Sequence, residues 1–165
     1  MRRKDRQITD TQDVLGILDR ARIIHLGLFD GGYPYVVPLH YGYQYSKEEN
    51  EIIFYMHGAQ EGKKLDLIRQ NPNVCVEIDC GESIISGGEI ACKYGASYAS
   101  VIGRGTAEIV EDAAVKASAL SILMEHQTGQ PFEISEKMAG SVSVIRVEVS
   151  DFTAKSRPPL KGSEQ

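Results

Sequence analysis

The stretch RIIHLGLFDGGYPYVVPLHYGYQY, residues 22–45, carries the strongest fold signal in the sequence. Apolar and β-branched residues lead to Asp30-Gly31-Gly32, a sequence typical of a tight hairpin turn. A second apolar and aromatic segment follows and contains Pro34 and Pro38. Because proline has no N–H to donate, this second strand must have an open edge, a bulge or a barrel mouth there. The stretch therefore predicts an antiparallel pair with one irregular edge.

Outward from this pair, short strands continue with single helices between them. Alternating apolar residues predict strands, helical spacing behind capping residues predicts helices, and Gly103 and Gly105 predict a bulge. The glycine-rich segment 81–96 has no clear period and predicts a long loop. The further strands are expected at 51–56, 74–78, 98–110 and 141–149, and the helices after Thr9-Asp10, at 62–71 and at 112–126.

Strands that follow one another in hairpins do not fit the regular alternation of a parallel βαβ sheet. The order predicts a mainly β fold with peripheral helices, built as a small antiparallel barrel of about six strands. We expect one domain over residues 1–150 and a polar C-terminal tail over 151–165, frayed from Lys155 onward.

Composition excludes several classes of protein. The chain of 165 residues has a net charge of −5, which argues against a nucleic-acid binder. No apolar run reaches the length of a membrane span, and the polar N-terminal residues do not form a signal peptide. We expect a soluble, cytoplasmic protein without a membrane or nucleic-acid partner.

The three cysteines indicate a reducing compartment. Their spacing fits neither a zinc knuckle nor a redox motif. Cys75 alternates with valines and is expected to be a buried, inert thiol. Cys80 and Cys92 flank the glycine-rich segment and are expected to be free thiols.

A helix start with two lysines is the richest candidate site. The segment YMHGAQEGKK, residues 55–64, leaves a strand at His57 and enters a helix at Gly62-Lys63-Lys64. Helix N-termini present unpaired N–H groups and the positive end of the helix dipole, so lysines are unusual there. A bound anion would explain them. The alternative is a pair of solvated surface lysines.

Tyrosines gather in the strand over residues 33–45 at alternate positions. A tyrosine ring with a polar tip suits the wall of a site for an aromatic ligand. The alternative is that these tyrosines are half-buried aromatics of the sheet without a ligand. Pro38 leaves neighbouring backbone groups free to bind the edge of a heterocycle.

The histidines fall into two groups. His25 lies within a strand and His126 at a helix end, and both are expected to be structural. His40 and His57 lie at strand ends where ligands approach. A metal site there lacks a third ligand at a recognisable spacing, so no metal site is expected.

These segments together resemble a known family. The motifs are GYP (32–34) with VPL (37–39), FYMHGA (54–59) with EGKK (61–64), and YASVIGRG (98–105). They resemble the pyridoxamine 5′-phosphate oxidase-like flavoproteins, and within these the nitroimidazole-resistance branch, which shares the opening RRKDR (2–6). The resemblance covers roughly residues 2–150.

The resemblance implies an FMN-binding split β-barrel that forms a homodimer, with FMN at the subunit interface. Lys63, with Lys64 in a lesser role, would hold the FMN phosphate, and His57 would be the catalytic residue nearest the substrate. Tyr98 and Ser100 would come from the partner subunit. The residues implied to bind the cofactor are Val37, Pro38, Leu39, His40, Tyr41, His57, Gly58, Ala59, Lys63, Lys64, Tyr98 and Ser100.

The first functional hypothesis is an FMN-dependent oxidoreductase of the flavin reductase or nitroreductase kind. It would pass electrons from a transiently bound NADH or NADPH to a small acceptor such as a nitro-aromatic compound. The alternative is a flavin- or heme-binding module without turnover, in which His40 or His57 would be an axial ligand.

Overall fold

The computed structural model describes residues 3–157. The strands are β1 (Gln7–Ile8), β2 (Ile23–Asp30), β3 (Tyr33–Ser46), β4 (Glu51–Gly58), β5 (Asn73–Ile85), β6 (Gly95–Val110) and β7 (Ser143–Arg157). The helices are α1 (Thr11–Arg20), α2 (Lys63–Gln70), α3 (Ala113–Thr128) and α4 (Glu136–Ala139), with 3-10 turns η1 (Lys4–Arg6) and η2 (Ala91–Lys93).

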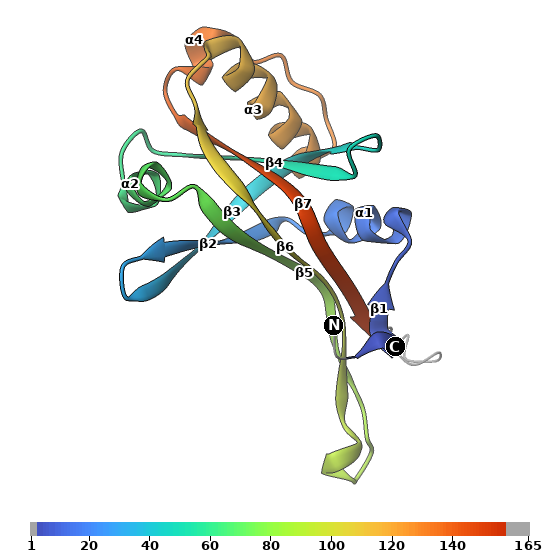
Figure 1. Ribbon diagram of the computed structural model, residues 1–165. Coiled ribbons are helices and arrows are strands. Elements are labelled where there is room, and N and C mark those ends of the chain that lie inside the picture. Colours follow the sequence, from blue (N-terminus) through green and yellow to red (C-terminus); the bar gives the residue numbers. More distant parts are fainter. Residues whose placement is uncertain (1–2, 158–165) are drawn as a thin grey trace.

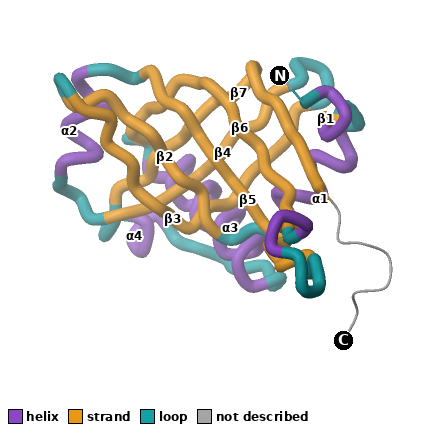
Figure 2. The backbone as a smooth tube through the Cα atoms, turned by 90° about the horizontal axis from the view of Figure 1, so that it is seen from below, coloured by secondary structure: helices purple, strands orange, loops and turns teal. Residues whose placement is uncertain are grey.

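Six strands close into an antiparallel barrel. Neighbours follow the order β7, β4, β3, β2, β5, β6, and β6 pairs again with β7, while β1 adds a short pairing to the far end of β7. Figure 2 shows the strands crossing in two layers around a shared interior. The predicted mainly β split barrel with peripheral helices is confirmed, and closure leaves few unpaired strand edges.

The β2–β3 hairpin forms at the predicted turn. Asp30 pairs with Tyr33, and Gly31 adopts a positive φ of 57°, a conformation that glycine takes without steric cost. The pairing continues without a shift as far as Ile23 opposite His40. The turn predicted at Asp30-Gly31-Gly32 is therefore confirmed.

Apolar side chains fill the barrel, and α1 and α2 cover its openings with their apolar faces. Burial of one such side chain stabilises the fold by about 1.5–3 kcal/mol. The fully buried core residues include Leu18, Ile24, Leu26, Phe54, Met56, Leu65, Ile78 and Ile145. Asp10 caps α1 by accepting a hydrogen bond from the Gln12 N–H at 2.7 Å.

Helix α3 packs outside the barrel, where Figure 1 shows it with α4 over the upper strands. It begins at Asp112, whose carboxylate accepts from the Val115 N–H at 2.9 Å. A Cβ at Gly42 of β3 would lie 2.5 Å from the Leu123 Cα. Glycine at position 42 therefore sets how closely α3 approaches the sheet.

The loop expected over 81–96 is shorter than predicted, because strands occupy both of its ends. β5 runs to Ile85 and β6 begins at Gly95, so the two strands form an arm with Ile84 paired opposite Ala96. The loop that remains covers residues 86–94 and contains η2. Figure 1 shows this arm extending below the barrel. The ladder is irregular between Cys80 and Ser83, and this break hid the strand pattern.

The last strand runs further than predicted. β7 continues beyond Val149 to Arg157, which pairs opposite Tyr98. Lys155 is therefore part of a strand and not of a frayed tail, while residues 158–165 lie outside the described residues. The bulge expected near Gly103 and Gly105 is confirmed, because the β6–β7 register shifts between Arg104 and Gly105.

All three cysteines are free thiols. The buried position expected for Cys75 is wrong: Val74 and Val76 point into the barrel, so Cys75 points out and is exposed. Among the described helices, none is long and apolar enough to cross a membrane.

Candidate functional site

The barrel opens between β3 and β4, and the opening begins at two histidines. β3 pairs with β4 only from Tyr41, which lies opposite Met56. One further step in this register would set His40 opposite His57, but there β3 remains paired with β2 and β4 with β7. Among the described residues, the edge of β3 before Tyr41 that faces away from β2 therefore has no strand partner.

This open edge contains the segment 37–41 that the sequence singled out. Val37 and Leu39 point towards the core and are half-buried, whereas Pro38 and His40 point outward and are exposed. The irregular edge predicted from Pro38 is confirmed. Backbone groups along an open edge are available to a ligand, as in other strand-edge recognition sites.

The N-terminus of α2 follows directly after the opening. β4 ends at Gly58, and Gly62 forms the N-cap of α2 with a φ of 142° and no side-chain cap. The Leu65 N–H donates to the Gly62 carbonyl at 2.9 Å. The earlier N–H groups of the first turn have no intrahelical acceptor, so this end of α2 presents donors and a partial positive charge.

Lys64 lies against the end of β4. A Cβ at Gly58 would lie 2.7 Å from the Lys64 Nζ and 2.8 Å from its Cε. The pKa of His57 is lowered, first by desolvation and then by the positive fields of His40 and Lys64. His40, His57 and Lys64 thus share one electropositive environment at the opening, next to the small residues Gly58 and Ala59.

Lys63 points elsewhere. Its ammonium forms an ion pair with Asp30 and lies 5.1 Å from the centre of the Tyr35 ring. Lys63 therefore links α2 to the β2–β3 hairpin. The two adjacent lysines differ in role, because no ion pair of Lys64 is found among the described residues.

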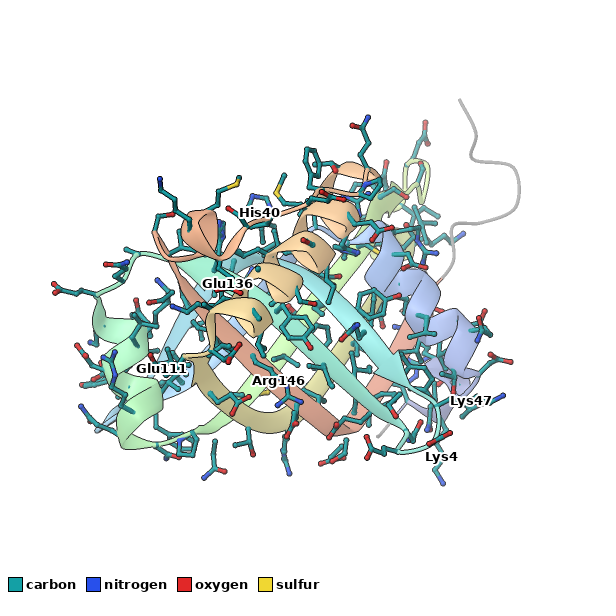
Figure 3. All side chains as sticks on the ribbon, turned by 90° about the horizontal axis from the view of Figure 1, so that it is seen from above. Lys4, His40, Lys47, Glu111, Glu136 and Arg146 are labelled. Carbon is teal, nitrogen blue, oxygen red and sulfur yellow. The ribbon has the colours of Figure 1, made fainter. Side chains whose placement is uncertain are left out.

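Gln127, in the last turn of α3, positions His40. The His40 Nδ1–H donates to the Gln127 Oε1 at 3.1 Å and to the Arg22 carbonyl at 3.3 Å. The Gln127 amide also donates to the Tyr41 carbonyl at 2.7 Å. Since both partners of Nδ1 are acceptors, the proton is on Nδ1, and Nε2 of the neutral ring is an acceptor. Figure 3 shows His40 on the side of the molecule that carries α3.

No local pattern in the sequence points to Gln127, because its partners are 86 to 105 positions away.

Tyr41 and Tyr43 of β3 face the interior, whereas Tyr33 is exposed at the start of the strand. Tyr41 is fully buried and donates to the Leu18 carbonyl at 2.7 Å, and burial raises its pKa. Tyr43 donates to the Asp19 carboxylate at 2.6 Å, and its pKa is raised by burial and by that bond. These hydroxyls anchor α1 to the barrel. These two tyrosines are therefore aromatic residues of the sheet and not the wall of a ligand site, so only the backbone of Tyr41 is open to a ligand.

Tyr98 and Ser100 are not near the opening within one chain. Ser100 pairs opposite Lys155, whereas Gly58 pairs opposite Ser143 at the other end of β7. At about 3.3 Å per residue, these two points of β7 are separated by up to about 40 Å. The Tyr98 hydroxyl accepts from Arg6 at 3.2 Å, and that bond lowers its pKa.

The two histidines expected to be structural both have protein partners. The His126 Nε2–H donates to the Ala21 carbonyl at 3.2 Å, and its ring lies 4.7 Å from that of Tyr41. The His25 Nδ1–H donates to Glu77 on the neighbouring strand at 3.0 Å.

An apolar groove of about 860 Å³ follows the outer face of β2, β3, β5 and β6. Phe29, Tyr33 and Val36 line it and are 61%, 82% and 58% exposed. None of the predicted site residues lines this groove. Large exposed apolar surface of this kind is typical of an interface between proteins.

Comparison with known proteins identifies the fold. Residues 10–156 match the family model described as pyridoxamine 5'-phosphate oxidase. No curated protein matches the chain. A solved structure from Bacteroides thetaiotaomicron, described as a "putative 5-nitroimidazole antibiotic resistance protein", is 32% identical, with a TM-score of 0.76 over 91% of this chain and 86% of that chain.

Two more distant structures share the fold. The flavocytochrome Anf3 from Azotobacter vinelandii is 22% identical, with a TM-score of 0.74 over 99% of this chain and 76% of that one. An FAD-binding protein from Mesorhizobium loti is 23% identical, with a TM-score of 0.62 over 93% of this chain and 98% of that one. The family match spans nearly the whole barrel, and the resemblance of the motifs is confirmed. The chain belongs to the pyridoxamine 5′-phosphate oxidase-like family.

Proposed function

We propose that this protein binds FMN at the opening between β3 and β4 and acts as an FMN-dependent oxidoreductase. The observation that carries the proposal is the meeting of an open strand edge with an uncapped, lysine-bearing helix N-terminus. A flavin mononucleotide presents a ring edge with donors and acceptors and a terminal phosphate. The open edge and the helix end offer complementary groups to these two parts.

The phosphate would be bound by the first-turn N–H groups of α2 together with lysine. Lys64 already lies beside Gly58 and His57, whereas Lys63 pairs with Asp30. Lys64 is therefore proposed as the main phosphate ligand, and Lys63 as a second cation that also fixes the hairpin. This reverses the ranking of the two lysines proposed from the sequence.

The ring would lie along residues 37–41 of β3, with backbone groups of the open edge bonded to its polar rim. His57, Gly58 and Ala59 would lie between ring and phosphate. The rings of His40 and His57 would face the substrate, and the lowered pKa of His57 favours its uncharged form. His57 is proposed as the catalytic residue.

The bound flavin supplies the redox chemistry, and the protein supplies binding, orientation and electrostatics. NADH or NADPH is the proposed hydride donor, and a small molecule such as a nitro-aromatic compound the proposed acceptor. The acceptor class is supported by the description of the 32% identical Bacteroides structure.

We further propose a homodimer, since members of this family generally assemble as pairs. The groove with Phe29, Tyr33 and Val36 supplies an apolar surface for the second copy. Tyr98, which is half-buried and distant from the opening of its own chain, would then reach the opening of the partner, whereas Ser100 is buried in its own chain and is not proposed to do so.

The test is spectroscopic. The purified full chain, supplied with FMN and freed of excess, is expected to show the absorption bands of oxidised flavin and to lose them when NADH or NADPH is added without oxygen. Addition of a nitro-aromatic acceptor should restore the bands. A protein that takes up no FMN contradicts the proposal. Bound FMN that neither donor reduces favours the module without turnover.

The heme alternative is tested with the same preparation. His40 has an acceptor Nε2 on an exposed ring, which is the atom an axial ligand needs. A sharp heme band after hemin addition that is lost in His40→Ala or His57→Ala would favour a heme-binding module over the oxidoreductase.

A further inference from the structure

A cluster of one histidine and two carboxylates lies outside the proposed flavin site. His25 of β2 is directly opposite Glu77 of β5, and Asp79 follows on the same face of β5. The ligand atoms of the three side chains all lie within 4.8 Å of one another. We propose that His25, Glu77 and Asp79 bind a divalent transition-metal ion, with Zn²⁺ as the ion to test.

The donor set selects the class of ion. One imidazole nitrogen and two carboxylate oxygens suit zinc and similar divalent ions, which accept both kinds of donor. Magnesium and calcium prefer oxygen alone and gain little from the imidazole. Three protein ligands on one side also leave positions open to water, as in zinc sites that are not purely structural.

The geometry needs only small side-chain rotations. Two atoms bound at about 2.1 Å to one tetrahedral ion are about 3.4 Å apart. The His25 Nδ1 and the Glu77 Oε2 are 3.0 Å apart, and Asp79 is exposed and free to turn towards them. The backbone already fixes the first two ligands, because His25 and Glu77 are a direct cross-strand pair.

The surroundings favour a cation. His25 and Glu77 line the groove proposed to receive the second copy, and in the single chain their side chains are 40% and 37% exposed. Arg104, the cation that lines the groove, lies opposite Cys75 and makes no ion pair with the cluster among the described residues. Two carboxylates with one neutral imidazole leave a charge that a divalent ion can neutralise.

The proposed metal site and the proposed flavin site use different residues. The metal site contains none of the residues proposed to hold FMN, although His25 pairs directly opposite Pro38 of β3, so the two sites are neighbours across the β2–β3 pair. Loss of metal binding and loss of FMN binding can therefore be measured independently in the same protein.

The experiment is calorimetric titration of Zn²⁺ into the full chain, with any affinity tag removed because polyhistidine binds zinc. We expect saturable binding of one Zn²⁺ per chain and much weaker binding of Mg²⁺. His25→Gln should lower the Zn²⁺ affinity about tenfold or more, and Glu77→Gln and Asp79→Asn should each lower it too. FMN binding should not change in these three variants.

Two controls make the result specific. Glu89→Gln removes an exposed carboxylate from the tip of the β5–β6 arm, and His40→Gln removes a histidine of the other site. Both should bind Zn²⁺ as the unchanged protein does. Absent Zn²⁺ binding, or binding that His25→Gln retains, overturns the proposal and leaves His25–Glu77 as a structural hydrogen bond.

Discussion

Lys64 folds back over Gly58, so closely that a Cβ on residue 58 would lie 2.7 Å from the Lys64 Nζ. The absence of a side chain at position 58 therefore allows the ammonium to lie beside His57. This contact links the end of β4 to the first turn of α2, the two elements that flank the proposed phosphate position.

Gly58→Ala should move the Lys64 ammonium and weaken FMN binding several-fold, with a smaller effect on riboflavin, which lacks the phosphate. Because the displaced atoms are the flexible end of a side chain, the free energy of unfolding should change by about 0.5 kcal/mol or less. Fluorescence titration and urea denaturation measure the two effects. Gly32→Ala is the matched control, since a Cβ there meets nothing within 4 Å.

The homodimer proposal predicts that Val36→Glu disrupts association. The substitution places a carboxylate in the apolar groove, where an interface would have to desolvate it. Sedimentation should give a dimer for the unchanged chain and mainly monomer, near 18.2 kDa, for the variant. Val115→Glu makes the same change on the exposed start of α3 and should remain dimeric. An unchanged dimer in Val36→Glu would place the interface elsewhere.

The bulge in β6 predicts a steric effect at Gly105. A Cβ there would lie 2.0 Å from the Glu148 carbonyl oxygen, a backbone atom that cannot move without disturbing β7. Gly105→Ala should destabilise the fold by about 1–3 kcal/mol or more.

Gly16→Ala is the opposite case, because a Cβ in this turn of α1 would lie 3.6 Å from Arg20. Alanine should stabilise the helix by about 0.5–1 kcal/mol. Urea denaturation of both variants checks the pair, and equal effects would contradict the packing described at Gly105.

Stability should fall at mildly acidic pH because of His126. Burial lowers its folded-state pKa below the ordinary value of 6.5. The unfolded state therefore binds the proton first, and the contribution is complete above pH 6.5 and is lost as pH falls through the lower folded-state pKa. His126→Gln should flatten this part of the stability profile measured by urea denaturation between pH 5 and 7.5. If the slope of stability against pH is the same in His126→Gln, the loss of stability at acidic pH comes from other groups, such as His57, whose pKa is also lowered.

The sequence predicted correctly those features of the fold that depend on residues adjacent in the chain. The turn at 30–32, the helix over 112–126 and the open edge at Pro38 each depend on the residues themselves, and each is found. The strand ends at 81–85 and 95–96 were missed because glycines and an irregular register obscure the alternation, even though the paired residues lie close together in the sequence.

The candidate site was only partly predictable, because its contacts join residues that are far apart in the sequence. The sequence identified the lysine pair but not which lysine meets Asp30, because that carboxylate lies 33 positions away. Gln127 and the His25–Glu77–Asp79 cluster come together only when strands and α3 assemble. Side-chain direction in β3 was also ambiguous, since the same alternation fits a ligand wall or a core.

The most direct test is a fluorescence titration of FMN and riboflavin against the unchanged protein and Lys64→Ala. A charge-assisted contact to phosphate is worth about 1.5–3 kcal/mol, so Lys64→Ala should weaken FMN binding by about 10- to 100-fold and leave riboflavin nearly unchanged. Lys63→Ala should weaken FMN binding less than Lys64→Ala does, because Lys63 pairs with Asp30. Equal losses for FMN and riboflavin in Lys64→Ala, or no FMN binding by the unchanged protein, would contradict the account.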